Sequence, residues 1–338
     1  MFVPQRVIFE TGSLDYPLGR QLYERFKAEK LPVLESSINK IKSNIPGDTP
    51  AQLYQSGKAT LVVGVKKSLS FQSCKPSAHF QLPLVSGCTG QCEYCYLNTQ
   101  LGDKPFIRLF VNLEEIFRRA DKYILQRLPD TTIFEGAATS DPVPVEPYTG
   151  ALKAAISHFA AEENARFRFV TKFTDIDSLL GVEHNNHTEI RFSLNTQTII
   201  KAYEHKTASA KKRLEASARL YSAGYPIGFI IAPVFIYENW QEEYKELLLE
   251  LHRLFPAAAR PITFEVISHR YTTKARNKIT EIFPQTNLDM DNEKRQFKYG
   301  QFGYGKYLYP GETLSLVKEF FQREISQIFE NGQIKYII

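Results

Sequence analysis

The fold is decided by the stretch Gly87-Cys88-Thr89-Gly90-Gln91-Cys92-Glu93-Tyr94-Cys95. It directly follows His79 to Val85, a short apolar segment that is predicted to form a strand. The three thiols have the spacing CxxxCxxC, and three thiolates on one short loop can hold three irons of a cubane iron–sulfur cluster. The fourth iron of such a cluster has no protein ligand and is open to another molecule.

An open iron is what a radical S-adenosylmethionine (SAM) enzyme needs. The amino and carboxylate groups of SAM chelate it, and one electron cleaves the sulfonium to give a 5′-deoxyadenosyl radical. We therefore predict a 4Fe-4S cluster on Cys88, Cys92 and Cys95, with Tyr94 packed beside SAM. The alternative is a structural zinc site with Cys74 or His79 as fourth ligand, although zinc sites more often pair CxxC units.

Short apolar runs alternate with amphipathic stretches from residue 74 onward. The predicted strands are His79–Val85, Thr131–Glu135, Arg166–Thr171, Glu189–Leu194, Tyr225–Val234 and Ile262–Ser268. The predicted helices are Leu113–Gln126, Tyr148–Ala161, Ile176–Leu180, Ala208–Ala223 and Trp240–Phe255. This alternation indicates an α/β fold, a partial (β/α)6 TIM-like barrel whose chemistry lies at the carboxyl ends of its strands.

Segments on both sides of the barrel complete a three-part organisation. Strands at Gln5–Phe9 and Thr60–Val65 around a helix at Leu18–Lys30 indicate a small N-terminal α/β lobe. Helical patterns recur at Lys274–Lys278 and Leu314–Phe329. We expect a lobe at 1–73, a barrel at 74–269 and a C-terminal extension at 270–338.

Composition limits the class of protein. The 338 residues are 43% hydrophobic and 23% charged, which excludes disorder and a disulfide-stapled miniprotein. The longest apolar run, Ile227–Ile236, contains a proline and is far shorter than the ~20 residues that span a bilayer. Because the N-terminus also lacks a signal-peptide core, we expect a cytoplasmic monomer without membrane contact.

Polar or small residues recur at the ends of successive predicted strands, where they could meet SAM. Any one of them could instead cap a helix or face solvent. Lys172 could pair with the SAM carboxylate, and the backbone around Ala232 allows close approach of the adenine. With Tyr94, the expected SAM-binding residues are Ser140, Asp141, Lys172, Ser193, Asn195 and Ala232.

The C-terminal extension is basic, aromatic and rich in glycine. Residues 270–306 contain eight Lys or Arg and four acidic residues, a difference of +4. This difference accounts for nearly all of the chain's net charge of +5. Cations that contact phosphates and aromatics that stack on bases suit a DNA-facing hairpin. The alternative is a solvated loop packed on the last helix. The expected DNA-contacting residues are His269, Arg270, Lys274, Arg276, Arg295, Lys298, Tyr299, Phe302, Tyr304 and Lys306.

Taken together, the segments of the chain resemble the spore photoproduct lyase family, radical SAM enzymes that repair DNA in endospore-forming bacteria. The resemblance runs through Phe71–His79, Cys88–Tyr96, Glu135–Asp141, Ile267–Arg270 and Phe302–Tyr307. It implies double-stranded DNA as partner, a reducing protein for the cluster, and a place in the spore or germinating cell core. The implied reaction splits 5-thyminyl-5,6-dihydrothymine, a methylene-bridged thymine dimer, into two thymines.

The resemblance also implies catalytic residues, and there the sequence departs from the family. Tyr94 and Tyr96 match tyrosines linked to returning the radical to SAM. Ala138 stands where the family has the cysteine that gives a hydrogen to the thymine methylene radical, so we expect impaired turnover. Two further hypotheses remain: a radical SAM enzyme acting on a peptide or small molecule, and a zinc-bearing DNA-binding protein without enzymatic activity.

Overall fold

The computed structural model describes the chain except for residues 1, 256–259, 300–302 and 304. Two compact units are found: unit 1 comprises residues 1–90 and 100–189, and unit 2 comprises 91–99 and 190–338. Within the described part of the chain, none of the helices is long and apolar enough to cross a membrane. The three-part division expected from the sequence stays a prediction.

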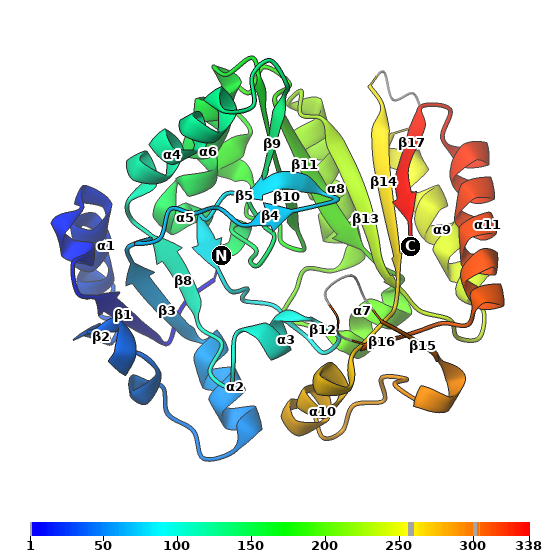
Figure 1. Ribbon diagram of the computed structural model, residues 1–338, viewed down its shortest axis with the longest axis horizontal. Helices are drawn as coiled ribbons and strands as arrows, with labels where there is room; N and C mark the ends of the chain where they lie inside the picture. Colours follow the sequence, from blue (N-terminus) through cyan, green and yellow to red (C-terminus); the bar gives the residue numbers. More distant parts are fainter. Residues whose placement is uncertain (1, 256–259, 300–302, 304) are drawn as a thin grey trace. The chain divides into compact units, whose positions relative to one another are not determined.

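The first part of unit 1 is a sheet with the strand order β2-β1-β3-β8-β6, parallel except for β6 (Figure 1). Its buried apolar residues include Ile8 and Val62, which pack on Ile41 and Ile45. The elements are β1 (Arg6–Glu10), α1 (Pro17–Ala28), β2 (Val33–Ser36), α2 (Pro50–Lys58), β3 (Thr60–Gly64), β6 (Val85–Ser86) and β8 (Ile107–Phe110).

Unit 1 also carries the strands predicted as the beginning of the barrel. β5 pairs in parallel with β9, and β9 with β10, while β4 runs antiparallel to β5. All seven residues of β10 alternate between buried and half-buried positions. The elements are β4 (Ser73–Cys74), β5 (Ala78–Gln81), α4 (Leu113–Leu125), β9 (Thr132–Glu135), α5 (Glu146–Thr149), α6 (Ala151–Ala160) and β10 (Ala165–Thr171).

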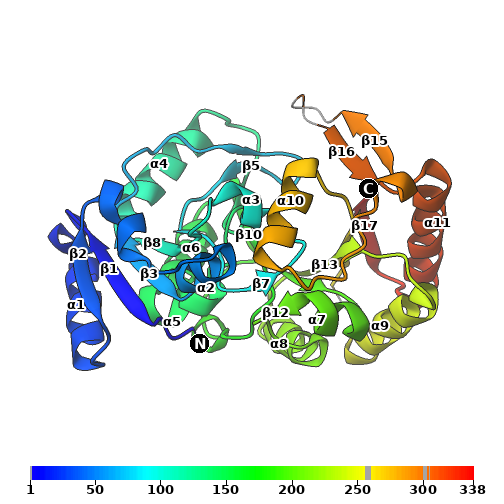
Figure 2. The same ribbon diagram turned by 90° about the horizontal axis from the view of Figure 1, so that it is seen from below.

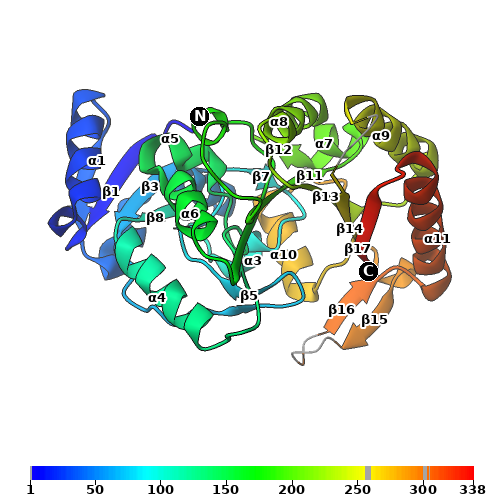
Figure 3. The same ribbon diagram turned by 90° about the horizontal axis from the view of Figure 1, so that it is seen from above.

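Unit 2 contains four parallel neighbours, β11, β13, β14 and β17, with α8, α9 and α11 along them (Figure 3). Its strands are β7 (Gln91–Cys92), β11 (Thr188–Leu194), β12 (Glu204–His205), β13 (Ile227–Val234), β14 (Ile262–Ser268), β15 (Gln296–Tyr299), β16 (Gly305–Leu308) and β17 (Gly332–Ile337). Its helices are α3 (Leu97–Gln100), α7 (Gln197–Tyr203), α8 (Ala210–Ser222), α9 (Trp240–Leu254), α10 (Thr273–Ile282) and α11 (Gly311–Ile328).

Five of the six predicted strands are present nearly as expected, whereas the first, His79–Val85, is divided into β5 and the short β6, which joins the other sheet of unit 1. Within each unit the predicted strands pair in parallel with one another. The predicted continuous helix Tyr148–Ala161 is wrong, because Gly150 adopts a left-handed conformation with φ +59° between α5 and α6. Glu146 explains the break, since its carboxylate accepts hydrogen bonds from the backbone N–H groups of Leu152 and Lys153 at 2.7 and 3.0 Å. The segment predicted as a helix at Ile176–Leu180 contains only a 3₁₀ turn, Asp177–Leu179.

Candidate active site

The cysteine loop begins at Gly87, which has φ +84°. A Cβ atom there would lie 2.4 Å from the carbonyl oxygen of Phe106, so this position requires glycine. The Gly87 N–H donates to the Thr139 carbonyl at 3.1 Å, and the Asp141 N–H donates to the Gly87 carbonyl at 3.4 Å. The first cysteine, Cys88, therefore starts beside the segment that follows β9 and contains Ala138.

Lys58 fixes the part of the loop in unit 1. This side chain is buried at the end of α2, and its Nζ donates to the carbonyls of Cys88 and Gly90, both at 2.8 Å. The Gly90 N–H in turn points to the Cys88 Sγ at 3.3 Å. Amide hydrogen bonds to the sulfurs are one way in which proteins tune iron–sulfur clusters, so this arrangement fits a cluster ligand.

A short strand pair fixes the part of the loop in unit 2. Cys92 of β7 is paired with Glu204 of β12 in an antiparallel register. The Asn98 side chain donates to the carbonyls of Cys92 and Glu93 at 3.1 and 3.0 Å, and the Cys95 N–H donates to the Cys92 carbonyl at 3.2 Å. The turn that carries the second and third cysteines is thus held by backbone and side-chain contacts.

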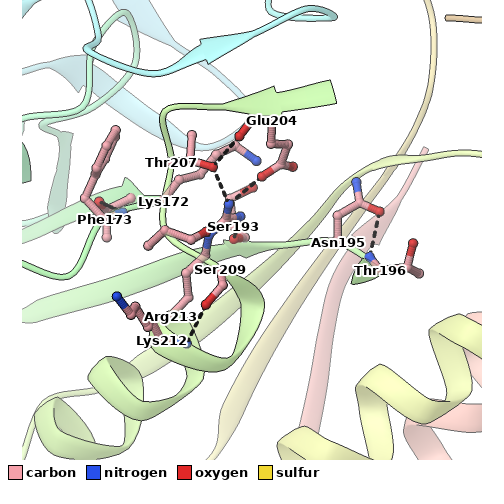
Figure 4. A network of polar contacts seen from close by, with 12 residues as sticks. Lys172, Phe173, Ser193, Asn195, Thr196, Glu204, Thr207, Ser209, Lys212 and Arg213 are labelled. Carbon is pink, nitrogen blue, oxygen red and sulfur yellow. Dashed lines mark hydrogen bonds and ion pairs between the residues drawn. The ribbon is translucent and has the colours of Figure 1, made fainter. Parts of the chain in front are cut away.

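Glu204 is at the centre of a buried polar network in unit 2 (Figure 4). Arg213 of α8 donates to the Glu204 carboxylate at 2.5 Å, to Thr207 at 2.8 Å and to the Ser193 carbonyl at 2.9 Å. The other carboxylate oxygen accepts from the Tyr94 hydroxyl. Because both charges are fully buried and hydrogen-bonded, they hold the loop rather than attract solvent or ligand.

The two tyrosines of the loop differ in environment. Tyr94 is half-buried and packs on Phe235 with ring centroids 5.7 Å apart. Burial, and next the charge of Glu204, raise the pKa of Tyr94 well above its usual value, so its hydroxyl keeps its proton at neutral pH. Tyr96 is 52% exposed. Tyr94 is therefore fixed by Glu204 and Phe235, whereas much of the Tyr96 side chain is open to solvent.

In unit 1, the carboxylate of Asp141 accepts hydrogen bonds from three residues, of which Lys172 is another predicted SAM-binding residue. The carboxylate accepts from the Thr171 hydroxyl at 2.9 Å, the Lys172 N–H at 2.9 Å and the Val143 N–H at 3.3 Å. Burial raises the pKa of Asp141 to about 6, against the opposite effect of these hydrogen bonds. Ser140 is buried and Lys172 is half-buried. Asp141 thus ties the end of β9 to the end of β10.

In unit 2, Asn195 has a similar structural role. Its Oδ1 accepts from the Tyr244 hydroxyl at 2.7 Å, and its Nδ2 donates to the Pro233 carbonyl at 2.8 Å (Figure 4 shows its contact with Thr196). The end of β11 is therefore tied to β13 next to Ala232, which is half-buried. Ser193 is buried, and its backbone carbonyl accepts a hydrogen bond from Arg213.

A cavity of about 490 Å³ lies in unit 1. One side is formed by Glu135, Gly136 and the Ala138–Ser140 segment, and another by residues that follow β3 or belong to β8. Ala138 therefore lines a space large enough for a ligand, as expected for a residue at a reacting position.

The predicted hairpin is present as β15 and β16 (Figure 2). Phe297 and Tyr299 are 46% and 78% exposed, and Lys298 lies directly opposite Lys306 across the two strands. At Gly305 a Cβ atom would overlap the tip of the Phe297 ring, so a larger residue there would require that ring to move. Lys274 is exposed and Arg276 half-buried on α10, while Phe302 and Tyr304 lie outside the described residues.

Two residues expected to contact DNA are buried at the base of the hairpin. Arg295 lies 3.7 Å over the Tyr309 ring and donates to the carbonyls of His269 and Asp289, both at 3.1 Å. Burial, followed by the charges of Arg295 and Arg270, lowers the pKa of His269 to about 3, so its ring is neutral. In this structure Arg295 and His269 hold the hairpin rather than face solvent, unlike the half-buried Arg270.

Sequence reasoning missed three residues that hold the cysteine loop: Lys58, Glu204 and Arg213. They are ordinary charged residues without a motif, so no pattern in the sequence indicates them. Among the residues described, no group of three or more His, Cys, Asp or Glu side chains is arranged as a metal site. The cluster ligands therefore remain a prediction from the motif.

The parallel strands and the CxxxCxxC loop define the class of radical SAM proteins. The family model for spore photoproduct lyase matches residues 2–338. A spore photoproduct lyase of Clostridium acetobutylicum is 53% identical over 334 residues, covering 99% of this chain and 98% of that protein. The Bacillus subtilis enzyme of this name is 44% identical over 336 residues, covering 99% and 98%.

Solved structures agree with the sequence comparison. A spore photoproduct lyase double variant with bound AdoMet and dinucleoside spore photoproduct has a TM-score of 0.97 at 43% identity, covering 100% of this chain and 99% of that one. A spore photoproduct lyase complexed with the dinucleoside lesion has a TM-score of 0.96, with the same identity and coverage. The chain belongs to the spore photoproduct lyase family and has the α/β fold of its members.

Proposed function

We propose that this protein is a DNA repair lyase that uses a SAM-derived 5′-deoxyadenosyl radical to split the spore photoproduct into two thymines. Membership of the family over residues 2–338 supports this function. The observation that carries it is the pairing of Gly87 with Thr139 and Asp141. That pairing sets the beginning of the cluster loop beside Ala138, the position of the family's hydrogen donor.

The proposed cofactors are a 4Fe-4S cluster on Cys88, Cys92 and Cys95, and SAM. When bound, the cluster supplies the electron that cleaves SAM. The chain's own part is to fix the loop, through Lys58 in unit 1 and Glu204 in unit 2. A separate reducing protein must bring the electron.

Lys172, Ser140 and Ser193 are the residues we assign to the polar end of SAM, and Ala232 to its adenine. Asp141 and Asn195 are assigned a positioning role, because their side-chain oxygens already accept hydrogen bonds within the protein. Tyr94 stands beside SAM, and both Tyr94 and Tyr96 take part in returning the radical. DNA is bound by the hairpin and the cations near it.

Ala138 cannot supply the final hydrogen, because an alanine methyl has no weak bond comparable to S–H. We propose that turnover is impaired at this step relative to an Ala138→Cys variant, and that Cys74 donates in its place. Cys74 is the cysteine outside the cluster motif. It is half-buried on β4, two residues after Gln72, which lines the same cavity as Ala138.

A second observation supports Cys74. In the double variant described above, one cysteine is replaced by alanine and one serine by cysteine, at positions 64 residues apart. Cys74 and Ala138 are also 64 residues apart. The cysteine at 74 and the alanine at 138 of the present chain thus have the same spacing as the cysteine and alanine introduced into that relative.

The test of the function is anaerobic reconstitution with iron and sulfide, followed by SAM, dithionite and a lesion-bearing dinucleotide. We expect a brown protein, 5′-deoxyadenosine and repaired thymine dinucleotide. A brown protein that cleaves SAM but leaves the lesion intact would favour a peptide or small-molecule substrate. A colourless zinc protein that binds DNA would favour the non-enzymatic alternative.

A further inference from the structure

The cavity that contains Ala138 has a cationic wall that the function described above does not use. Lys66 follows β3, Arg108 lies on the neighbouring β8, and both line the cavity (Figure 1 shows the two strands). Both cations lie over the ring of the buried Phe110, with the Lys66 Nζ 5.7 Å and the Arg108 guanidinium carbon 5.2 Å from its centroid.

The two cations differ in how their charge is balanced. Arg108 forms an ion pair with the buried carboxylate of Glu10. Gly64 leaves room for this pair, since a Cβ atom at position 64 would overlap both side chains. Lys66 is half-buried and forms no ion pair with any acidic residue in the described part of the chain. Burial and the charge of Arg108 lower the pKa of Lys66 without bringing it a compensating anion.

The backbone of Lys66 is fixed before any ligand arrives. Its N–H donates to Asn112 Oδ1 at 2.8 Å, and its carbonyl accepts from Asn112 Nδ2 at 3.1 Å. Asn112 is itself buried at the start of α4 and donates to Glu115 at 2.8 Å. Because this backbone is already fixed, binding an anion orders only the Lys66 side chain, which favours binding.

We propose that Lys66 binds a phosphodiester of the lesion-bearing DNA strand, next to the thymines that Ala138 faces. The inference rests on the proposed function, since it takes the cavity as the lesion site. Ser68 and Ser70 line the same wall and supply hydroxyl donors suited to phosphate oxygens. Both Ala138, the position of the hydrogen donor, and Ser140, assigned to the polar end of SAM, line this cavity. Lys66 is assigned to the phosphate because Lys172 is already assigned to the SAM carboxylate.

The experiment compares two forms of the lesion on reconstituted protein: the dinucleoside, which lacks the linking phosphate, and the dinucleotide, which has it. The variants are Lys66→Gln and Lys66→Arg, with Lys67→Gln as control, because Lys67 is the exposed next residue. We expect Lys66→Gln to weaken dinucleotide binding about tenfold, the range of one charge-assisted hydrogen bond. Binding of the dinucleoside should not change, Lys66→Arg should keep most of the preference, and Lys67→Gln should equal the wild type.

Equal losses for the two ligands would overturn the proposal, because they would mean that Lys66 supports the fold of the cavity. So would unchanged dinucleotide affinity, or a loss of SAM affinity with the phosphate preference retained. A wild type that binds neither form of the lesion would contradict the proposed function itself.

Discussion

In unit 2, Arg213 and Glu204 form an ion pair that is fully buried, whereas Lys298 and Lys306 of the hairpin face each other near the surface. Every charge of the first pair is used inside the protein, where it fixes the turn that carries Cys92. Like charges directly opposite each other destabilise a strand pair unless an anion lies between or beside them. The comparison separates a buried pair of opposite charges that holds the cysteine turn from two like charges on the hairpin, the segment proposed to bind DNA.

Breaking the buried pair should have the largest effect on stability. Arg213→Met leaves the Glu204 carboxylate buried without its partner, which should lower the free energy of unfolding by about 3–5 kcal/mol. The loop that carries Cys92 and Cys95 should also lose its support, so the visible absorbance of the reconstituted cluster should fall. Lys211→Met, at an exposed position on the same helix, is the control. An Arg213→Met protein as stable as this control would show that the network is not structural.

The titration of His269 shows whether the base of the hairpin is buried like the Arg213–Glu204 pair. The pKa of His269 in the folded protein is about 3, against an ordinary value of 6.5. Below pH 6.5 the His269 ring therefore binds a proton in the unfolded chain but stays neutral in the folded protein. The free energy of unfolding should consequently fall as pH falls from 6.5 toward 3. Between pH 7 and 5 this amounts to about 2 kcal/mol.

The measurement is urea unfolding of the wild type and of His269→Gln at both pH values. The variant lacks the titrating ring, so its loss of stability on acidification should be smaller by that amount. Parallel losses in the two proteins would mean that His269 is accessible to protons in the folded state, and the hairpin base would not be the dry structure described here.

These structural roles mark the limit of what the sequence predicts. Hydrophobic alternation identified five of the six strands closely but merged β5 and β6 into one, and the cysteine motif follows β6. The hydrophobic pattern did not identify β8 and β17. Their pairing partners, β3 and β14 respectively, are distant in sequence. The partners of buried charges are equally non-local: Glu204 contacts Tyr94 across 110 residues. Composition likewise predicted a hairpin but could not tell the buried Arg295 from the exposed Lys298.

Lys172 is half-buried, so its exposure to solvent lies between that of the buried Arg213 and that of the exposed Lys298. If its ammonium binds the SAM carboxylate, Lys172→Ala should weaken SAM binding by roughly tenfold, as expected for one charge-assisted hydrogen bond. The cluster absorbance should stay unchanged, because the loop contacts described above are made by Lys58, Asn98 and Glu204. Equilibrium titration with SAM measures the effect, and an unchanged dissociation constant would remove Lys172 from the SAM site.

The hairpin cations should matter least for folding. Replacing Lys298 and Lys306 together by glutamate should cost less than breaking the buried pair: about 0.5 kcal/mol or less of the free energy of unfolding at the exposed Lys298, and somewhat more at the half-buried Lys306. The same protein should bind duplex DNA more weakly, and the slope of log affinity against log salt should decrease by about 2, or roughly 0.9 for each lost phosphate contact. SAM cleavage should persist. Unchanged affinity and salt slope would assign the hairpin to packing.

The central claim is that this chain completes repair with a thiol that is not at position 138. The direct measurement is repair of the lesion dinucleotide in D2O, where cysteine thiols carry deuterium, by the wild type and by Cys74→Ala. The wild type should place one deuterium in the restored thymine methyl group. Cys74→Ala should lose clean repair and give adducts at the methylene carbon, and the further change Ala138→Cys should restore both the yield and the deuterium. Equal yields and labelling in the wild type and Cys74→Ala would contradict the account, because the hydrogen would then come from another source.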